Sequence, residues 1–422
     1  MDKMTFWLIT LMTIICIPYA RAEEEEERLS IHGFLQSDYS VRTGRQDTSS
    51  LKDGDFLLGE ERVQLEIERH SQDDEAGLFL KADAFHNALE GQTDMELREG
   101  YLILHLSPIS LRLGRQIVTW GISDFLFIND VFPKDWQSFF SGRPMEYLKI
   151  GADCLKADFK GKTISAEILV IPFFQPDRLP SAERFFFYNP MAGIDQREEL
   201  PAKDKDNTEF ALRLYRHIAR TDFALYTYRG FFRSPAMQPD TLPVPTLITL
   251  DYPKLRVYGL SAQKSMGQGV TGLEVGYYES KDDRDGTNSF ITNSHTRGLV
   301  GYQRQLWSDC TLWLQYYGEY MHQYNAYENN LMSGFPKQDR FREVATFRLT
   351  QFFNYQTCQV SLLAFYGISE KDYFIIPEVK YQVNDKSWIA LGVNLFGGKK
   401  DTTFFGQFEK NDNMYLTMRS NF

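Results

Sequence analysis

Apolar and polar residues alternate along most of this chain with a period of two. In the segment from Arg62 to Glu68, every second residue is aliphatic and the others are charged or carry an amide. A strand places two such sets on opposite faces, whereas a helix would scatter both sets around its surface. The pattern therefore predicts β-strands with one apolar and one polar face.

About eighteen segments of this kind follow one another along the chain. Many are longer than the ~5–6 residues of a usual strand, and their length suits the ~9–11 tilted residues with which a strand crosses a bilayer. The predicted strands span residues 31–43, 55–70, 74–87, 95–106, 108–118, 145–159, 162–174, 207–219, 221–233, 253–265, 268–280, 294–307, 309–323, 340–354, 356–368, 371–383, 386–396 and 412–422.

The connections between the predicted strands are of two kinds. Tight turns are predicted at 160–161, 220–221, 308–309, 355–356 and 384–385, and long loops at 119–144, 175–206, 234–252, 281–293, 324–339 and 397–411. Short periplasmic turns and long extracellular loops are the layout of a transmembrane barrel. We therefore predict an all-β fold, a transmembrane antiparallel β-barrel of about 18 strands, with 16 as the next alternative. It forms one domain over residues 30–422.

A barrel in a membrane must be closed, because backbone groups in hydrocarbon have no water partner. With about 16–18 strands the bore is too wide for side chains to fill. We therefore expect a water-filled channel unless loops plug it.

The start of the chain has the pattern of a secretory signal. Lys3 precedes an apolar run from Phe6 to Tyr19, and the residues at 20–22 fit the small-x-small cleavage pattern. We expect a cleaved signal peptide at 1–22 and an acidic periplasmic tail at 23–29.

The other end of the chain agrees with export. Residues 413–422 form a short alternating strand that ends in Phe422. Bacterial outer-membrane barrels characteristically end in this way, because the assembly machinery docks the final strand and its terminal aromatic residue. We expect the protein in the bacterial outer membrane, with membrane lipid and, through Phe422, the barrel-assembly machinery as partners.

Composition narrows the class of protein further. The mean hydropathy of -0.39 resembles that of a soluble protein, yet 15% of the residues are aromatic, with 23 Tyr and 33 Phe. A barrel combines these features, because its lipid face is a thin apolar band with aromatic girdles and its lumen is polar. The net charge of -11 without a basic cluster argues against a nucleic-acid partner.

Catalytic and metal-binding patterns are missing from the sequence. The seven histidines are isolated, and no GxSxG motif occurs. The three cysteines after the signal, Cys154, Cys310 and Cys358, are widely spaced and odd in number. We therefore expect no enzyme, no metal and no cofactor.

One stretch stands apart from the alternation. Residues 111–121 read LRLGRQIVTWG, and an Asn-Asp-Val-Phe-Pro segment follows at 129–133. The stretch resembles a motif of bacterial outer-membrane porin-like barrels, including relatives of the alginate-export type, in which an LGRQ…WG strand is followed by an Asn/Asp-Pro loop. Segments 176–180, 395–398 and 405–408 and the final strand are similar to the same group. The resemblance implies a porin-like channel. We see no dense arginine set comparable to that of an alginate conduit, so a polyuronate is not the solute we expect.

The stretch allows two interpretations. In the first, the loop folds into the barrel and Arg112, Arg115 and Gln116 line a constriction, where guanidinium and amide groups offer donors to a carboxylate or hydroxylated solute. In the second, Arg115 and Trp120 only hold the loop against the wall. The motif also includes Gly121, Asn129, Asp130 and Pro133.

Alternation identifies further candidates for the lumen. Their mixed signs predict either a transverse field with modest selectivity or ion pairs between neighbouring strands. These candidates are Arg62, Glu66, Glu68, Lys81, Asp83, Arg213 and Arg348.

The sequence therefore predicts an outer-membrane channel for passive or weakly selective passage of small polar or anionic solutes. One alternative is a barrel that sheathes a partner, such as a periplasmic electron carrier or a secreted polymer. Another is a plugged uptake channel for hydrophobic compounds, which the aromatic content of loops 119–144 and 175–206 would suit. A homo-oligomer and a periplasmic partner both stay open.

Overall fold

The computed structural model describes residues 28–422 except 45, 72–74 and 124. The expected signal peptide at 1–22 and most of the expected acidic tail at 23–29 lie outside the described residues. The last two residues of that tail, Arg28 and Leu29, already belong to the first strand.

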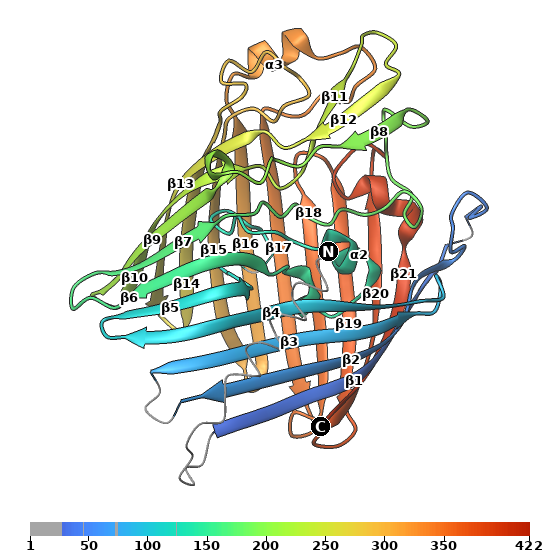
Figure 1. Cartoon of the computed structure of the whole chain (residues 1–422). Helices are drawn as coiled ribbons and strands as arrows, with labels where there is room; N and C mark the ends of the chain where they lie inside the picture. Colours follow the sequence, from blue (N-terminus) through green and yellow to red (C-terminus); the bar gives the residue numbers. More distant parts are fainter. Residues whose placement is uncertain (1–27, 45, 72–74, 124) are drawn as a thin grey trace.

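In the part of the chain that the structure describes, eighteen strands form one antiparallel sheet that closes on itself (Figure 1). Each strand pairs with its neighbours in the chain, and the first pairs with the last. The prediction of an 18-stranded barrel is thus confirmed. The strands are β1 (Arg28–Arg42), β2 (Phe56–His70), β3 (Ala76–Asn87), β4 (Gln92–Leu106), β5 (Ile109–Gln116), β6 (Ala152–Phe159), β7 (Ser165–Ile171), β9 (Glu209–Ile218), β10 (Thr221–Phe231), β13 (Lys254–Met266), β14 (Gly269–Ser280), β15 (His295–Trp307), β16 (Cys310–Met321), β17 (Phe341–Phe353), β18 (Cys358–Gly367), β19 (Asp372–Gln382), β20 (Ser387–Gly398) and β21 (Asn413–Asn421).

The alternation of the sequence sets the two faces of this sheet. On β2, Val63 and Leu65 are exposed on the outer face, as are apolar side chains along the other strands. Arg62 and Glu66, on either side of this pair, face the interior. There Glu66 lies directly opposite Lys81 of β3 and forms an ion pair with it at 2.8 Å. The outer face is therefore an apolar band, as a barrel in a membrane requires.

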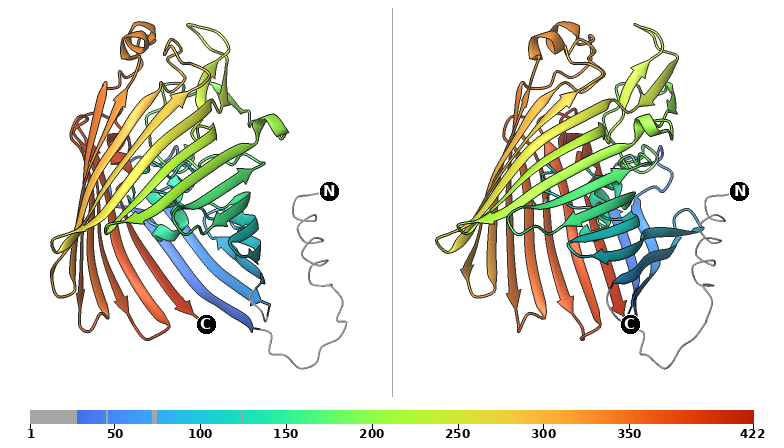
Figure 2. Two further views of the ribbon diagram at one scale, coloured as in Figure 1. Left: turned by 90° about the vertical axis from the view of Figure 1, so that its left-hand side faces the viewer. Right: turned by 60° about the vertical axis from the view of Figure 1, so that its left-hand side comes forward.

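The connections differ between the two ends of the barrel (Figure 2). The end that we call the turn end carries the five predicted tight turns, and the opposite loop end carries the six predicted long loops. Two loop-end connections, 88–91 and 368–371, are short, and residues 43–55 form a further long one. The segregation of short turns from long loops is thus the predicted one.

Short elements lie within the loops. The helical turns are α2 (Trp136–Ser141), η1 (Met145–Leu148), η2 (Lys205–Asn207), α3 (Tyr324–Asn330) and η3 (Gly406–Asn411), and a small separate sheet contains β8 (Asp195–Glu198), β11 (Ala236–Pro239) and β12 (Leu247–Asp251). None of the helices in the described residues is long and apolar enough to cross a membrane.

One predicted strand begins later than expected. The prediction placed a strand at 145–159, but residues 145–148 form η1 and the strand begins at Ala152. The reason is tertiary, because Tyr147 and Leu148 are buried in the barrel interior rather than paired in the sheet.

Closure places the carboxy-terminal residue beside β1. Phe422 exchanges two backbone hydrogen bonds with Gly33, at 2.9 and 3.3 Å. A Cβ at Gly33 would lie 2.4 Å from the Phe422 ring, so glycine is needed there for the ring to cross the strand. The terminal aromatic residue thus packs on the seam of the barrel.

Candidate functional site

The connection between β5 and β6, residues 117–151, lies inside the barrel together with α2 (Figure 1). We call it the inner loop. Its first part packs in an apolar cluster with the wall formed by β6 to β14, and the Trp120 and Phe132 rings meet edge to face with centroids 5.1 Å apart. The inner loop is therefore part of the interior and not a free surface loop.

Two carboxylates of the wall bind this first part by hydrogen bonds. The Trp120 indole Nε1 donates to Glu167 Oε1 at 2.7 Å. The Glu274 carboxylate accepts from the Ile122 and Asn129 backbone amides at 3.0 and 2.9 Å and from Asn129 Nδ2 at 3.0 Å. Trp120 and Asn129 of the sequence motif therefore hold the inner loop against the wall.

Gly121 has a specific role at this contact. Its φ of +84° is in the left-handed region, and a Cβ there would lie 2.5 Å from Glu274 Oε1. We expect Gly121→Ala to destabilise the inner loop by about 1–3 kcal/mol, because it combines an unfavourable φ with a clash against a buried carboxylate. Urea unfolding and limited proteolysis would measure the change.

Gly193 offers a matched control for this prediction. Its φ is +81°, but nothing lies within 4 Å of the position of its Cβ. Gly193→Ala therefore has only the conformational cost. Equal losses of stability in the two variants would contradict the role that we assign to the Glu274 contact.

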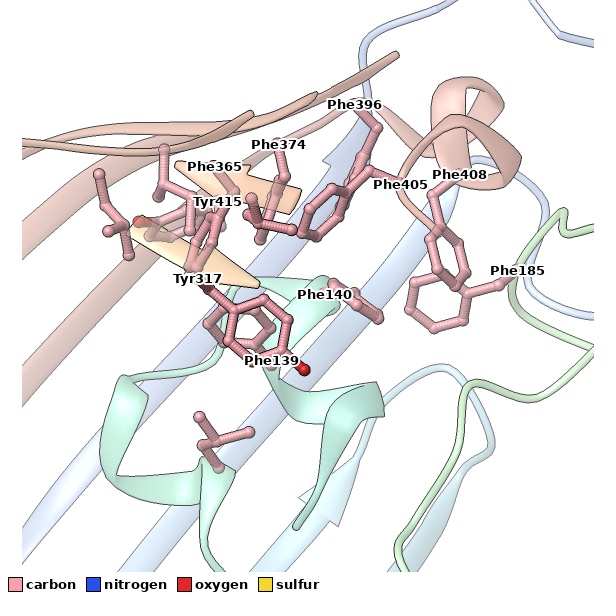
Figure 3. Packing of buried hydrophobic residues seen from close by; sticks show 14 of the residues in the cluster. Phe139, Phe140, Phe185, Tyr317, Phe365, Phe374, Phe396, Phe405, Phe408 and Tyr415 are labelled. Carbon is pink, nitrogen blue, oxygen red and sulfur yellow. The ribbon is translucent and has the colours of Figure 1, made fainter. Parts of the chain in front are cut away.

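The second part of the inner loop packs on the opposite wall (Figure 3). Phe139 and Phe140 of α2 contact a cluster of aromatic side chains from β18 to β21 and η3. The centroid of the Phe140 ring lies 4.6 Å from that of Phe408 and 5.7 Å from that of Phe374, and the Phe139 centroid lies 5.4 Å from that of Phe374. The inner loop thus spans the interior from wall to wall.

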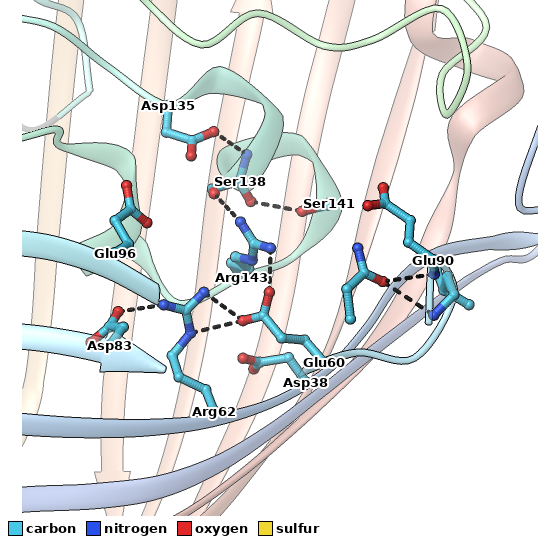
Figure 4. A network of polar contacts seen from close by, with 12 residues as sticks. Asp38, Glu60, Arg62, Asp83, Glu90, Glu96, Asp135, Ser138, Ser141 and Arg143 are labelled. Carbon is cyan, nitrogen blue, oxygen red and sulfur yellow. Dashed lines mark hydrogen bonds and ion pairs between the residues drawn. The ribbon is translucent and has the colours of Figure 1, made fainter. Parts of the chain in front are cut away.

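A network of charges attaches the inner loop to β2 and β3 as well (Figure 4). Arg62 forms ion pairs with Glu60 and Asp83, and Arg143 of the inner loop binds the other oxygen of Glu60 and the Ser138 hydroxyl. Arg62 is only 3% exposed and Asp83 is fully buried. Both face inward as their alternation indicates, but they lie beneath the inner loop.

Asp130 organises the middle of the inner loop. Its carboxylate forms ion pairs with Lys134 at 2.9 Å and with Lys149 at 2.7 Å. Burial lowers the pKa of the Lys134 ammonium group, and burial raises the pKa of Asp177, which accepts from the Lys134 backbone amide at 2.8 Å. The carbonyl of Pro133 accepts from the Ile150 amide, so the middle of the inner loop is held to its last residues.

A small hollow lies between the inner loop, the loop at 172–208, β4 and β5. Five cationic side chains and the two carboxylates of Glu96 and Asp135 line it. Most of the cations have a carboxylate partner: Arg115 binds Asp153 at 2.9 Å, and Arg178 binds Asp135 at 2.7 Å and Glu96 at 3.2 Å. The cations are Arg98, Arg115, Arg143, Lys149 and Arg178.

Arg98 differs from the other cations of the hollow. Its guanidinium donates to the backbone carbonyls of Glu146 and Lys149 at 2.8 and 3.4 Å and stacks on Tyr147 at 4.2 Å. Among the described residues it forms no ion pair with a carboxylate. It is therefore the one cation of the hollow whose N–H groups no carboxylate of the described residues takes up.

Sequence reasoning missed Arg98 because a bulge changes the face on which it lies. Lys81 of β3 pairs with Glu99, but the next residue, Ala82, pairs with Leu97, so residue 98 is the extra one. Strict alternation from inward-facing Glu99 would place residue 98 on the lipid face. No local sequence pattern in β4 marks this bulge.

The other predicted lumen residues lie outside the hollow and have partners in the interior. Arg112 lies 5.5 Å from the Tyr101 ring, Gln116 is buried and donates to the carbonyls of Arg112 and Cys154, Glu68 binds His70 at 2.8 Å, Arg213 lies 3.8 Å from Glu167, and Arg348 lies 5.9 Å from the Phe125 ring.

Solved structures of bacterial outer-membrane proteins share this fold. OccK2 of Pseudomonas aeruginosa, solved in complex with glucuronate, aligns with a TM-score of 0.57 and 9% identity over 93% of this chain and 98% of its own. OccD3 of the same organism aligns with a TM-score of 0.56 and 12% identity over 96% of this chain and 93% of its own. OccAB3 of Acinetobacter baumannii aligns with a TM-score of 0.56 and 10% identity over 94% of this chain and 99% of its own. At these identities the likeness concerns the fold alone.

Comparison at the level of sequence gives the family. No curated protein matches the chain. The model of a family described as "Protein of unknown function (DUF1302)" matches residues 87–422, which include the inner loop and all strands from β4 onward. The chain, an 18-stranded porin-like barrel of the outer-membrane type, therefore belongs to the DUF1302 family.

Proposed function

We propose that this protein is a channel of the bacterial outer membrane for small anionic solutes, with its constriction beside the inner loop. The observation that carries the proposal is the hollow, in which five cationic side chains face two carboxylates. Four of these cations are paired with carboxylates, which leaves Arg98 as the cation available to a solute. Export through cleavage after residue 22, with the loop end outside the cell, belongs to the same proposal.

The electrostatics of the hollow suit transient binding of an anion. Walls of low dielectric constant focus the field of the cations into the space between them. Arg98 has N–H groups that no carboxylate of the described chain occupies, and a guanidinium fork matches a carboxylate in geometry. Conduction also requires that the solute leaves, which neighbouring Glu96 and Asp135 favour by repelling it.

The solute class that we propose is a small carboxylate, including sugar acids. OccK2, which shares the fold, was solved with glucuronate. We favour a single sugar acid over a polymer of sugar acids as the solute, because the inner loop spans the interior from one wall to the other.

The packing of the inner loop supports this function over the two alternatives. Uptake of hydrophobic compounds would need apolar surface open to a ligand, whereas Phe139 and Phe140 are buried against other aromatic rings. A sheath for a partner protein or polymer would need the space that the inner loop occupies. Nothing in the site requires an enzymatic reaction, and we propose none.

Conductance in a planar bilayer tests the proposal. We expect the refolded protein to give stable steps, with a reversal potential under a salt gradient that shows anion preference. Arg98→Gln shortens the side chain and removes the charge but keeps an N–H donor. It should reduce the anion-to-cation permeability ratio roughly threefold to tenfold and weaken block by glucuronate.

Arg216→Gln is the matched control, because Arg216 is exposed at the turn end of β9, outside the residues that line the hollow. Its permeability ratio should equal that of the wild type. A folded barrel without current would contradict the channel, and cation preference in the wild type would contradict the proposed solute class.

A further inference from the structure

A second charged hollow lies on the outside of the barrel, at the loop end of β10, β13 and β14. Four cationic side chains line it, those of Arg229, Lys254, Arg256 and Lys281, together with one carboxylate, that of Asp206. The inner loop does not contribute to this hollow, so the proposed channel leaves it unexplained.

Two arginines face each other directly in this hollow. Arg229 of β10 pairs in register with Arg256 of β13, and Arg256 pairs with Glu279 of β14. Like charges directly opposite on neighbouring strands destabilise a sheet. Glu279 binds Lys281 at 3.0 Å and Arg284 at 3.4 Å.

Within the described part of the chain, neither Arg229 nor Arg256 forms an ion pair with a carboxylate. Asp206 lines the same hollow, and none of the ion pairs of the described residues includes it. The row of cationic side chains that lines this hollow therefore carries more positive charge than the protein itself neutralises. This excess points to an anion from outside.

The side chains below this row show its level in a membrane. Two residues further into the strands, Tyr258 and Tyr277 lie directly opposite each other on the outer face and are 48% and 38% exposed. Two residues further again, Leu225, Leu260 and Val275 are exposed in one row. Tyrosines between an apolar band and polar residues mark the interface of a membrane. The arginines therefore lie at the level of lipid headgroups.

We propose that Arg229 and Arg256, with Lys254 and Lys281, bind the phosphate groups of a phosphorylated glycolipid in the leaflet around the loop end. Guanidinium groups bind phosphate through two parallel hydrogen bonds. The acyl chains of the same lipid lie along the apolar row below. The inference rests on the proposed placement of the barrel in an outer membrane with its loops outside, and not on the solute of the channel.

Native mass spectrometry of the whole barrel in detergent tests this site. The probes are bisphosphorylated lipid A, the same lipid with its phosphates removed, and inorganic phosphate. We expect the wild type to retain bisphosphorylated lipid A. The double variant Arg229→Gln/Arg256→Gln should bind it at least about tenfold more weakly. Lys264→Gln, on the outer face at the turn end of β13, is the matched control and should bind as the wild type does.

A thermal unfolding measurement would check that the double variant is folded. Without lipid it should unfold at or above the temperature of the wild type, because the repulsion between the two arginines is gone, and its conductance should be unchanged. Added bisphosphorylated lipid A should raise the unfolding temperature of the wild type more than that of the double variant.

Three results would overturn the assignment. One is equal retention of lipid A by the double variant and the wild type. Another is equal retention of the lipid without phosphates. The third is stabilisation of the wild type by inorganic phosphate to the same extent as by lipid A, which would assign the site to a free anion. A barrel that binds lipid A as expected but passes no current would contradict only the channel.

Discussion

Phe140→Ala is expected to release α2 from the wall of β18 to β21 and to raise the conductance of the proposed channel. The Phe140 ring contacts those of Phe374, Phe396 and Phe408, at centroid distances of 5.7, 5.7 and 4.6 Å. Removing a buried phenylalanine side chain costs about 3–5 kcal/mol. A helix of six residues is not stable by itself, so its position depends on this packing.

Single-channel recording and limited proteolysis of the inner loop would measure the release. Phe223→Ala is the matched control, because Phe223 is exposed on the outer face of β10 and contacts no part of the inner loop. In the Phe223→Ala variant, the conductance and the rate of proteolysis of the inner loop should stay near the wild-type values. An unchanged conductance and a protected loop in Phe140→Ala would show that the aromatic cluster does not hold the constriction.

Glu274→Gln is expected to loosen the first part of the inner loop without altering the barrel. The carboxylate accepts three hydrogen bonds from the inner loop, two of them from the backbone amides of Ile122 and Asn129. A glutamine keeps the volume but replaces one acceptor oxygen with an amide donor that faces these donors. Buried donors without an acceptor cost about 1–3 kcal/mol each. The local loss should therefore be about 2–5 kcal/mol.

Hydrogen exchange measures this loss at the amides concerned. Exchange at Ile122 and Asn129 should accelerate by at least roughly tenfold, while strands β13 and β14 stay protected. Glu279→Gln serves as the control, because Glu279 lies on the outer face of the same strand and binds Lys281 and Arg284 instead. Unchanged protection of the two amides would argue that Trp120 and the aromatic cluster suffice to hold the loop.

The strands and their faces could be predicted from the local sequence pattern, because the two faces of a barrel strand depend only on the alternation of a few consecutive residues. Alternation such as that from Arg62 to Glu68 assigns each side chain to lipid or interior, whatever the strand pairs with. The same rule places Glu66 and Lys81 inside, where they pair. It fails where the backbone departs from regular pleating, as at Arg98, since a bulge inserts one residue and exchanges the faces beyond it.

The arrangement of the inner loop could not be predicted in the same way, because its anchors come from distant segments. Trp120 meets Glu167 of β7, Asn129 meets Glu274 of β14, and Arg143 meets Glu60 of β2. The two interpretations of the sequence motif had treated a constriction and a wall anchor as alternatives. In the structure Trp120 anchors the loop, whereas Arg115 lines the hollow beside it.

By itself the sequence determined the class of fold, a strand number of about 18 with 16 as the alternative, most of the short and long connections, and the side of the sheet on which most residues lie. These follow from a period of two and from turn lengths, which are properties of short segments. Only the tertiary structure decided that one loop spans the interior and that cations from β4, β5 and two loops meet in one hollow. It also decided that Arg229 and Arg256 face each other outside. The physical reason is that charge and packing act through space, between residues whose distance along the chain carries no information about their contact.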